Sequence, residues 1–306
     1  MMKVKAAFWV SGVSAVLATV LRCLQLLFFF NDETGFVTDS GVFTYLYCGV
    51  LLVSTLVSGI LCRTDRETCG VMQRARSWGA ATTSLLSMLF LFYCAFVLFL
   101  ETYTFKTYSV TYSIEPQHIM AHLPLAVLCV LFGIACIVTA VGWLRGGILP
   151  GGAGVVRIFA VLWGLYFMVL TFMTYSADAT TQENLFTVGG GALMVLFLLQ
   201  ESKLLSGTGG RKVPQYMYIV GLPAASYWLT YVLSNTVLIF FGRGYRTEMP
   251  YVLQLVMLVL ALHTVSMLVV LRRRAVFTPS SDLNRQNPVR SERKETEKSR
   301  TNERFN

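Results

Sequence analysis

The chain has 306 residues, of which 55% are hydrophobic and only 13% are charged, and its mean hydropathy is +0.61. About a quarter of the residues in a soluble domain are charged, so this composition excludes a water-soluble enzyme, a nucleic-acid-binding protein and a disordered chain. Most of the chain is therefore expected to lie in a lipid bilayer, with no nucleic acid as a partner.

Long apolar segments follow one another along the chain. In hydrocarbon every backbone amide must be hydrogen-bonded within its own segment, so an apolar run of ~20 residues predicts a membrane-spanning helix. The predicted fold class is an all-α, polytopic transmembrane helix bundle formed by residues 1–271. Its eight predicted spans are residues 6–30, 43–62, 79–100, 123–144, 158–176, 185–200, 215–241 and 250–271.

The sixth and seventh predicted spans each contain an irregularity. The apolar run of the sixth stops at Gln200, and it reaches full length only if Glu201 and Lys203 extend their charged groups to the interface. Pro223 interrupts the seventh span, and a proline inside a helix removes one hydrogen bond and predicts a kink.

The distribution of Lys and Arg predicts the direction of the helices, because cytoplasmic loops carry an excess of both. If the N-terminus is cytoplasmic, the outer loops contain only Lys106, Arg243 and Arg246, and the inner segments hold most of the remainder. Both termini are therefore predicted to be cytoplasmic. The formal net charge of +9 reflects this topology and the basic tail.

Two polar segments outside the spans carry further predictions. Residues 272–306 begin with three arginines and lack apolar periodicity, which predicts a basic, disordered cytoplasmic tail. The arginines would contact the anionic inner leaflet, and the alternative is that the tail docks a cytosolic or membrane protein partner. On the outer side, residues 102–113 are rich in β-branched and aromatic side chains, which predicts a short hairpin.

Polar side chains inside the spans are the candidate binding residues. A charged group in hydrocarbon costs ~2.5–3.5 kcal/mol on insertion scales, so Arg22 needs a reason to lie roughly 12 Å below the outer end of its helix. Gln25 shares its face, and Asn235, Gln254 and Glu101 are also predicted in the outer half. The sequence predicts an outward-facing ligand-binding pocket in which Arg22 binds an anion. The alternative is a network of hydrogen bonds that stabilises the bundle.

Evidence for metal or cofactor chemistry is weak. Glu115, His118 and His122 would share one face of a helix and are candidate metal ligands, although histidines at a membrane interface are the ordinary alternative. The glycine-rich segment 146–154 lacks the Gly-Lys-Ser/Thr ending of a phosphate-binding loop, so no cofactor is expected. His263 is isolated among apolar residues and is expected to form a hydrogen bond within the bundle. No catalytic residue is predicted.

The run Leu21-Arg22-Cys23-Leu24-Gln25-Leu26, followed by Asp32-Glu33-Thr34-Gly35-Phe36, resembles the opening of uncharacterised multi-pass membrane proteins from clostridial-type Gram-positive bacteria. The resemblance covers residues 1 to about 40. It implies a location in the bacterial cytoplasmic membrane, as a multi-pass cell-membrane protein, and implies no activity.

Three classes of function follow from these features. A small-solute transporter or permease would use Arg22 and the helix containing Pro223, but the sequence offers no conspicuous carboxylate inside the membrane for proton or sodium coupling. An accessory or sensory subunit acting through a protein partner needs no such residue. An intramembrane enzyme is the least favoured, because the sequence shows no nucleophile–base pair at matching depth.

Overall fold

The computed structural model describes residues 2–31, 38–64, 71–72, 76–108, 121–145, 154–174, 185–206, 210, 212–241 and 249–276. These residues form a helical bundle, which confirms the predicted fold class. The long helices are α1 (Met2–Phe28), α2 (Val42–Thr64), α3 (Trp78–Tyr108), α5 (His122–Arg145), α6 (Ile158–Thr174), α8 (Gly191–Leu205), α9 (Val213–Phe240) and α10 (Tyr251–Arg274).

Short elements complete the described chain. A 3₁₀-helix, η2 (Val155–Arg157), leads into α6, and a π-helix, η3 (Leu185–Gly190), leads into α8. Two-residue strands β1 (Val71–Met72) and β2 (Ala275–Val276) pair antiparallel and join the α2–α3 connection to the segment after α10.

Seven helices are long and apolar enough to cross a membrane, so the chain is an integral membrane protein. Helix α9 is not one of the seven, although its 28 residues extend ~42 Å. It packs against α1, α2, α8 and α10, and most of its side chains are buried. A helix enclosed by other helices contacts little lipid and can carry more polar side chains. This explains why the hydropathy of α9 is lower than that of the seven candidate spans.

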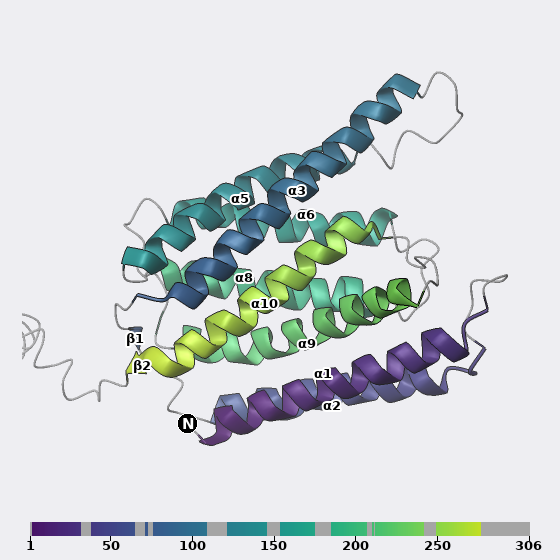
Figure 1. The fold of residues 1–306 in the computed structure, drawn as a ribbon. Coiled ribbons are helices and arrows are strands. Elements are labelled where there is room, and N and C mark those ends of the chain that lie inside the picture. The colour runs from purple at the N-terminus through teal and green to yellow at the C-terminus, as the bar shows by residue number, and fades with distance from the viewer. Residues whose placement is uncertain are drawn as a thin grey trace, which may run out of the picture.

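The helices form a ring with a hairpin packed against it (Figure 1). Around the ring, α3 contacts α5, α5 contacts α6, α6 contacts α8, α8 contacts α9, α9 contacts α10, and α10 returns to α3. The α1–α2 hairpin covers α9 from outside the ring. The N-terminus and the end of α10 lie at the same end of the bundle, beside β1 and β2 (Figure 1).

The prediction of a hairpin after residue 100 was wrong, because α3 continues to Tyr108. The Thr102 hydroxyl donates to the Leu98 carbonyl at 2.8 Å, and the Thr104 hydroxyl donates to the Leu100 carbonyl at 2.7 Å. Threonine satisfies its hydroxyl within a helix in this way, so a β-branched composition does not stop a helix that is already formed. Residues 109–113 lie outside the described residues.

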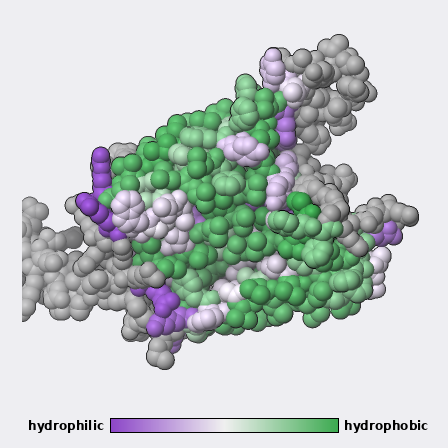
Figure 2. Space-filling view, viewed as in Figure 1, coloured by the Kyte–Doolittle hydropathy of each residue, from purple (hydrophilic) through white to green (hydrophobic). Residues whose placement is uncertain are grey.

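On the face shown in Figure 2, the surface between the two ends of the bundle is predominantly hydrophobic, and hydrophilic residues gather at the ends. Large apolar side chains on this surface are well exposed, including Trp9, Phe96 and Phe172. Such exposure would be unfavourable in water and is normal for side chains that face lipid tails.

Gly221 provides a test of helix packing. A Cβ atom at Gly221 in α9 would lie 2.8 Å from a ring carbon of Phe197 and 3.2 Å from a methyl carbon of Leu268. Both neighbours are buried, so an added methyl group would force them to shift within a packed interior. We therefore expect Gly221→Ala to reduce the free energy of unfolding by about 1–3 kcal/mol, which denaturant unfolding in mixed micelles would measure. Gly49→Ala is the control, because its Cβ would meet nothing within 4 Å. Equal stability of the two variants would contradict this packing.

Candidate functional sites: two buried charged clusters

Arg22 lies where four elements meet. Its side chain comes from α1 and is only 2% exposed. The guanidinium carbon lies 4.7 Å from the ring centroid of Phe186 in η3, 5.3 Å from that of Tyr231 in α9 and 5.8 Å from that of Tyr47 in α2. These separations are within the ~6 Å range of cation–π attraction. We call Arg22 with these three rings the outer cluster.

The π-helix places Phe186 in the outer cluster. A Cβ atom at Gly190, the last residue of η3, would lie 3.3 Å from the indole nitrogen of Trp228 and 3.4 Å from Cβ of Tyr227. The absence of a side chain there lets η3 approach α9 closely, as small residues do between membrane helices. Single π-helical turns frequently occur at functional sites, because they redirect the side chains of one turn.

Gln25 links the outer cluster to the beginning of α2. Its side-chain nitrogen donates to Asp39 at 3.0 Å and to the Thr44 hydroxyl at 2.7 Å. The Asp39 carboxylate also accepts from the backbone amides of Gly41 and Phe43, at 3.0 and 2.9 Å. Asp39 therefore caps α2, and Gln25 holds the cap against α1. The buried Gln25 side-chain oxygen has no donor among the described residues.

Asn235 and Gln254 form a second polar contact near the outer cluster. The Asn235 side-chain nitrogen donates to the Gln254 side-chain oxygen at 3.0 Å, and Gln254 donates to the Met249 carbonyl at 3.3 Å. Asn235 follows Tyr231 by four residues, so both lie on one face of α9, with Asn235 one turn nearer the helix end. This pair joins α9 to α10.

Glu101 lies elsewhere. Its carboxylate is half exposed and is 3.7 Å from Nδ1 of His122, across the contact between α3 and α5. The five predicted pocket residues therefore lie in three separate places. Arg22 and Gln25 lie together, Asn235 and Gln254 form a pair, and Glu101 is apart from both. Helix α9 contributes to the first two places. Glu115 and His118 lie outside the described residues. The described part of the chain contains no group of three or more His, Cys, Asp or Glu residues that could hold a metal ion.

A second charged cluster, which the sequence analysis missed, lies inside the ring near the opposite end. Glu201 of α8 is completely buried, and Arg157 of η2 and His263 of α10 are 1% and 4% exposed. An Arg157 Nη atom donates to one Glu201 oxygen, and Nε2 of His263 lies 2.9 Å from the other. We call these three side chains the inner cluster. The expectation that the sixth span reaches full length only if Glu201 extends to the interface was wrong, because α8 continues to Leu205 while this carboxylate is paired inside the bundle.

Two threonines connect the inner cluster to the remaining helices. Arg157 Nη1 donates to the Thr139 hydroxyl of α5 at 3.1 Å. Nδ1 of His263 lies 3.1 Å from the Thr83 hydroxyl of α3. Side chains from η2, α8, α10, α5 and α3 are therefore linked through the inner cluster. The burial of Glu201 inside the bundle also corrects the expectation that the interior offers no conspicuous carboxylate for proton or sodium coupling.

One signal in the sequence could have indicated the inner cluster. Glu201 is followed by Leu204 and Leu205, so the apolar pattern resumes after the carboxylate. His263 occupies the middle of another apolar run. Ionisable residues inside the membrane usually pair with one another, so two of them in different spans predict a contact. The identity of the partner still depends on which helices are neighbours.

A chain of aromatic rings lies between the two clusters. Phe132 of α5 contacts Trp163 of α6 at a centroid distance of 5.4 Å, and Trp163 stacks on Phe167 at 5.3 Å. Phe167 contacts Trp228 of α9 at 6.0 Å, and Trp228 contacts Tyr231 of the outer cluster at 5.8 Å. These rings fill the interior with large rigid groups. The buried indole nitrogen of Trp228 has no acceptor among the described residues.

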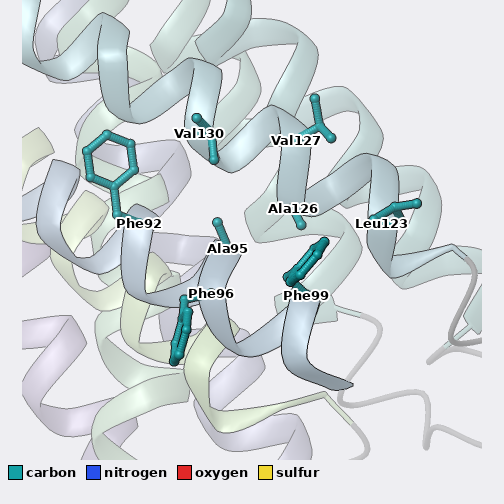
Figure 3. A pocket seen from close by; sticks show the side chains of 8 residues that line it. All are labelled: Phe92, Ala95, Phe96, Phe99, Leu123, Ala126, Val127 and Val130. Atoms are coloured by element: carbon teal, nitrogen blue, oxygen red, sulfur yellow. The ribbon is translucent and has the colours of Figure 1, made fainter. Parts of the chain in front are cut away.

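Two apolar grooves lie on the flank of the bundle. The groove between α3 and α5 has a volume of about 390 Å³, and the described side chains that line it are all apolar, including Phe92, Phe96, Phe99 and Val130 (Figure 3). The groove between α1 and α2, beside Leu17 and Tyr45, has a volume of about 520 Å³. Within the described part of the chain, the α3–α5 groove therefore offers no polar side chain to orient a charged solute, and it suits lipid tails.

The architecture and the two charged clusters define an integral membrane bundle with ionisable groups in its interior. Comparison with known proteins adds no relative, since no family model, curated protein or solved structure matches the chain.

The inner cluster predicts an asymmetric response to charge removal. Glu201→Leu leaves Arg157 buried without its counter-charge, and we expect a loss of about 3–5 kcal/mol in the free energy of unfolding. The double variant Arg157→Leu/Glu201→Leu removes both charges, so it should recover much of that loss. Denaturant unfolding in mixed micelles would measure both, with Lys203→Ala as an exposed control on the same helix. A double variant less stable than Glu201→Leu would refute the pairing.

Proposed function

We propose that this chain is a small-solute transporter of the bacterial cytoplasmic membrane, and that the outer cluster is the entry site for an anionic solute. The location is supported by the seven apolar helices and by the resemblance of the N-terminal residues to bacterial membrane proteins. The substrate class is supported by the chemistry of Arg22, which is the observation that carries the proposal.

A guanidinium suits anion recognition inside a membrane protein. It presents donors in a planar fork that matches carboxylate and phosphate groups, and it is hydrated more weakly than an ammonium group. In the outer cluster, Phe186, Tyr231 and Tyr47 fix the position of this fork. Burying a charge in the bundle is costly, and a functional role would explain why it is retained.

The arrangement of the interior supports transport by alternating access. The outer cluster, the aromatic chain and the inner cluster follow one another between the two ends of the bundle, and α9 contributes Trp228 and Tyr231 to this series. Transporters commonly place irregular helices beside the substrate site, where the chain can rearrange. The π-helix η3 and Pro223 in the interior of α9 are irregularities of this kind.

An accessory or sensory subunit is the second candidate function. The β1–β2 pair supports it, because this pair joins the beginning of the basic tail to the α2–α3 connection. A partner that binds the tail could therefore act directly on α2, α3 and α10.

Purification from the native membrane in mild detergent separates the two proposals. A stoichiometric second protein would favour the accessory function, and a single monodisperse species would favour the transporter.

Ligand binding at Arg22 is testable without knowledge of the natural solute. In a panel of small carboxylates and phosphates, we expect at least one anion to raise the melting temperature of the wild-type protein. At 100 times its dissociation constant a ligand adds about 2.7 kcal/mol of stability. Arg22→Leu should abolish the shift while the protein remains folded. Arg22→Lys should weaken it, because an ammonium group lacks the planar fork.

Two controls make this test decisive. Arg145→Leu removes an exposed charge at the far end of α5 and should leave the shift unchanged. Phe186→Leu keeps the charge and removes the ring closest to it, so the shift should decrease. If no anion stabilises the wild-type protein, or if Arg22→Leu responds as the wild type does, Arg22 has a structural role.

A further inference from the structure

We propose that the inner cluster is a proton-binding site in which His263 accepts the proton, Glu201 provides the counter-charge and Thr83 accommodates both protonation states. The proposal starts from Glu201. Arg157 donates to one Glu201 oxygen and His263 contacts the other, and the adjacent positive charge stabilises the ionised carboxylate, which can only accept hydrogen bonds. Nε2 of His263 must therefore carry a hydrogen in either charge state of the ring. The exchangeable proton is therefore the one on Nδ1.

The Thr83 hydroxyl suits such a change at Nδ1. It lies 3.1 Å from Nδ1 of His263, 3.0 Å from the Gly79 carbonyl and 3.2 Å from the Ala80 carbonyl. A hydroxyl has one hydrogen and two lone pairs. When His263 is neutral, the hydroxyl donates to Nδ1. When His263 is charged, the hydroxyl accepts from Nδ1 and turns its own hydrogen to a carbonyl of α3. Neither state leaves a polar atom of the imidazole ring unpaired.

The other groups around His263 are compatible with one exchangeable proton. Arg157 of η2 donates to Glu201 and to the Thr139 hydroxyl of α5, and Cys136 of α5 lies within electrostatic range of Arg157 and Glu201. Helix α9 contributes Tyr218, whose hydroxyl donates to the Leu268 carbonyl five residues along α10. With His263 neutral, the charges of Arg157 and Glu201 cancel. With His263 protonated, the cluster carries a net charge of +1.

The position of the cluster gives the proton a short route to one side of the membrane. Glu201 lies four residues before the end of α8, and Thr83 lies five residues after the beginning of α3. These separations correspond to roughly 6–8 Å along the helices. The loading of the site would therefore respond to pH on the side that the Lys and Arg distribution predicts to be cytoplasmic.

A proton at this site could be coupled to solute movement, and this extension rests on the proposed transport function. The net charge of +1 on the loaded cluster and the negative charge of an anionic solute are opposite, so carrying both together costs less than carrying either alone. Proton binding itself does not depend on transport and is tested separately.

Histidine NMR tests proton binding directly, because the chain contains only three histidines. In ¹⁵N-histidine-labelled protein in lipid nanodiscs, His263→Gln would assign the signals of His263 by their disappearance. From about pH 8 to about pH 5, we expect Nε2 of His263 to stay protonated while Nδ1 gains a proton. A ring whose charge and tautomer stay constant over this range would overturn the proposal.

Variants distinguish a proton site from a purely structural bridge. Thr83→Val should weaken proton binding by about tenfold or more, because the charged imidazole loses its acceptor. Thr83→Ser should restore it. Thr82→Val is the control, since among the described residues the Thr82 hydroxyl bonds to the Gly79 carbonyl and not to His263. Unchanged titration in Thr83→Val would refute the role of Thr83.

Coupling requires a separate measurement. Liposomes that contain the protein would be given an anion that binds at Arg22, and solute uptake and proton movement would be measured together. Solute uptake without proton movement would refute coupling alone.

Discussion

The structure depends on the rule that a charge inside a bilayer must be paired within the protein. Glu201 satisfies this rule by contacting Arg157 and His263, and Thr139 and Thr83 extend the contacts to two further helices. Side chains from α3, α5, α8, α10 and η2 therefore meet in one cluster. Between membrane helices the hydrophobic effect contributes little, because lipid tails are as apolar as the helix surfaces. Directional polar contacts of this kind can specify which helices become neighbours.

The outer cluster follows the same rule with different chemistry. The guanidinium of Arg22 is surrounded by the rings of Phe186, Tyr231 and Tyr47, and these come from three different elements. Cation–π attraction holds the charge in place and fixes the orientation of the planar guanidinium. The two clusters differ accordingly: the inner one contains its own carboxylate, and the outer one places aromatic faces against its charge. The inner cluster therefore joins a carboxylate to an imidazole, and the outer cluster orients a guanidinium.

Helix α9 connects the outer cluster to the aromatic chain and to α10. It carries Tyr231 beside Arg22, Trp228 in the aromatic chain and Asn235 in the contact with α10. It is also in contact with both helices of the α1–α2 hairpin and with α8 and α10 of the ring. A shift of α9 would therefore alter the surroundings of Arg22 and the packing of the ring together. Its hydropathy is lower than that of the seven helices that are apolar enough to cross a membrane, and this difference reflects its central position.

The sequence by itself determined the helical membrane fold and the approximate bounds of its helices. Those properties follow from the absence of water in the bilayer, which acts on each segment separately. It also identified Arg22 and Gln25 as neighbours, because residues three apart share a helix face. Only the tertiary structure decided that Glu201 is buried between Arg157 and His263, that Phe186 faces Arg22, and that Glu101 lies apart from the other predicted pocket residues. Arg157, Glu201 and His263 lie far apart in the chain, and each has an ordinary explanation when considered alone. Their partnership depends on which helices pack together, and that is a property of the whole bundle.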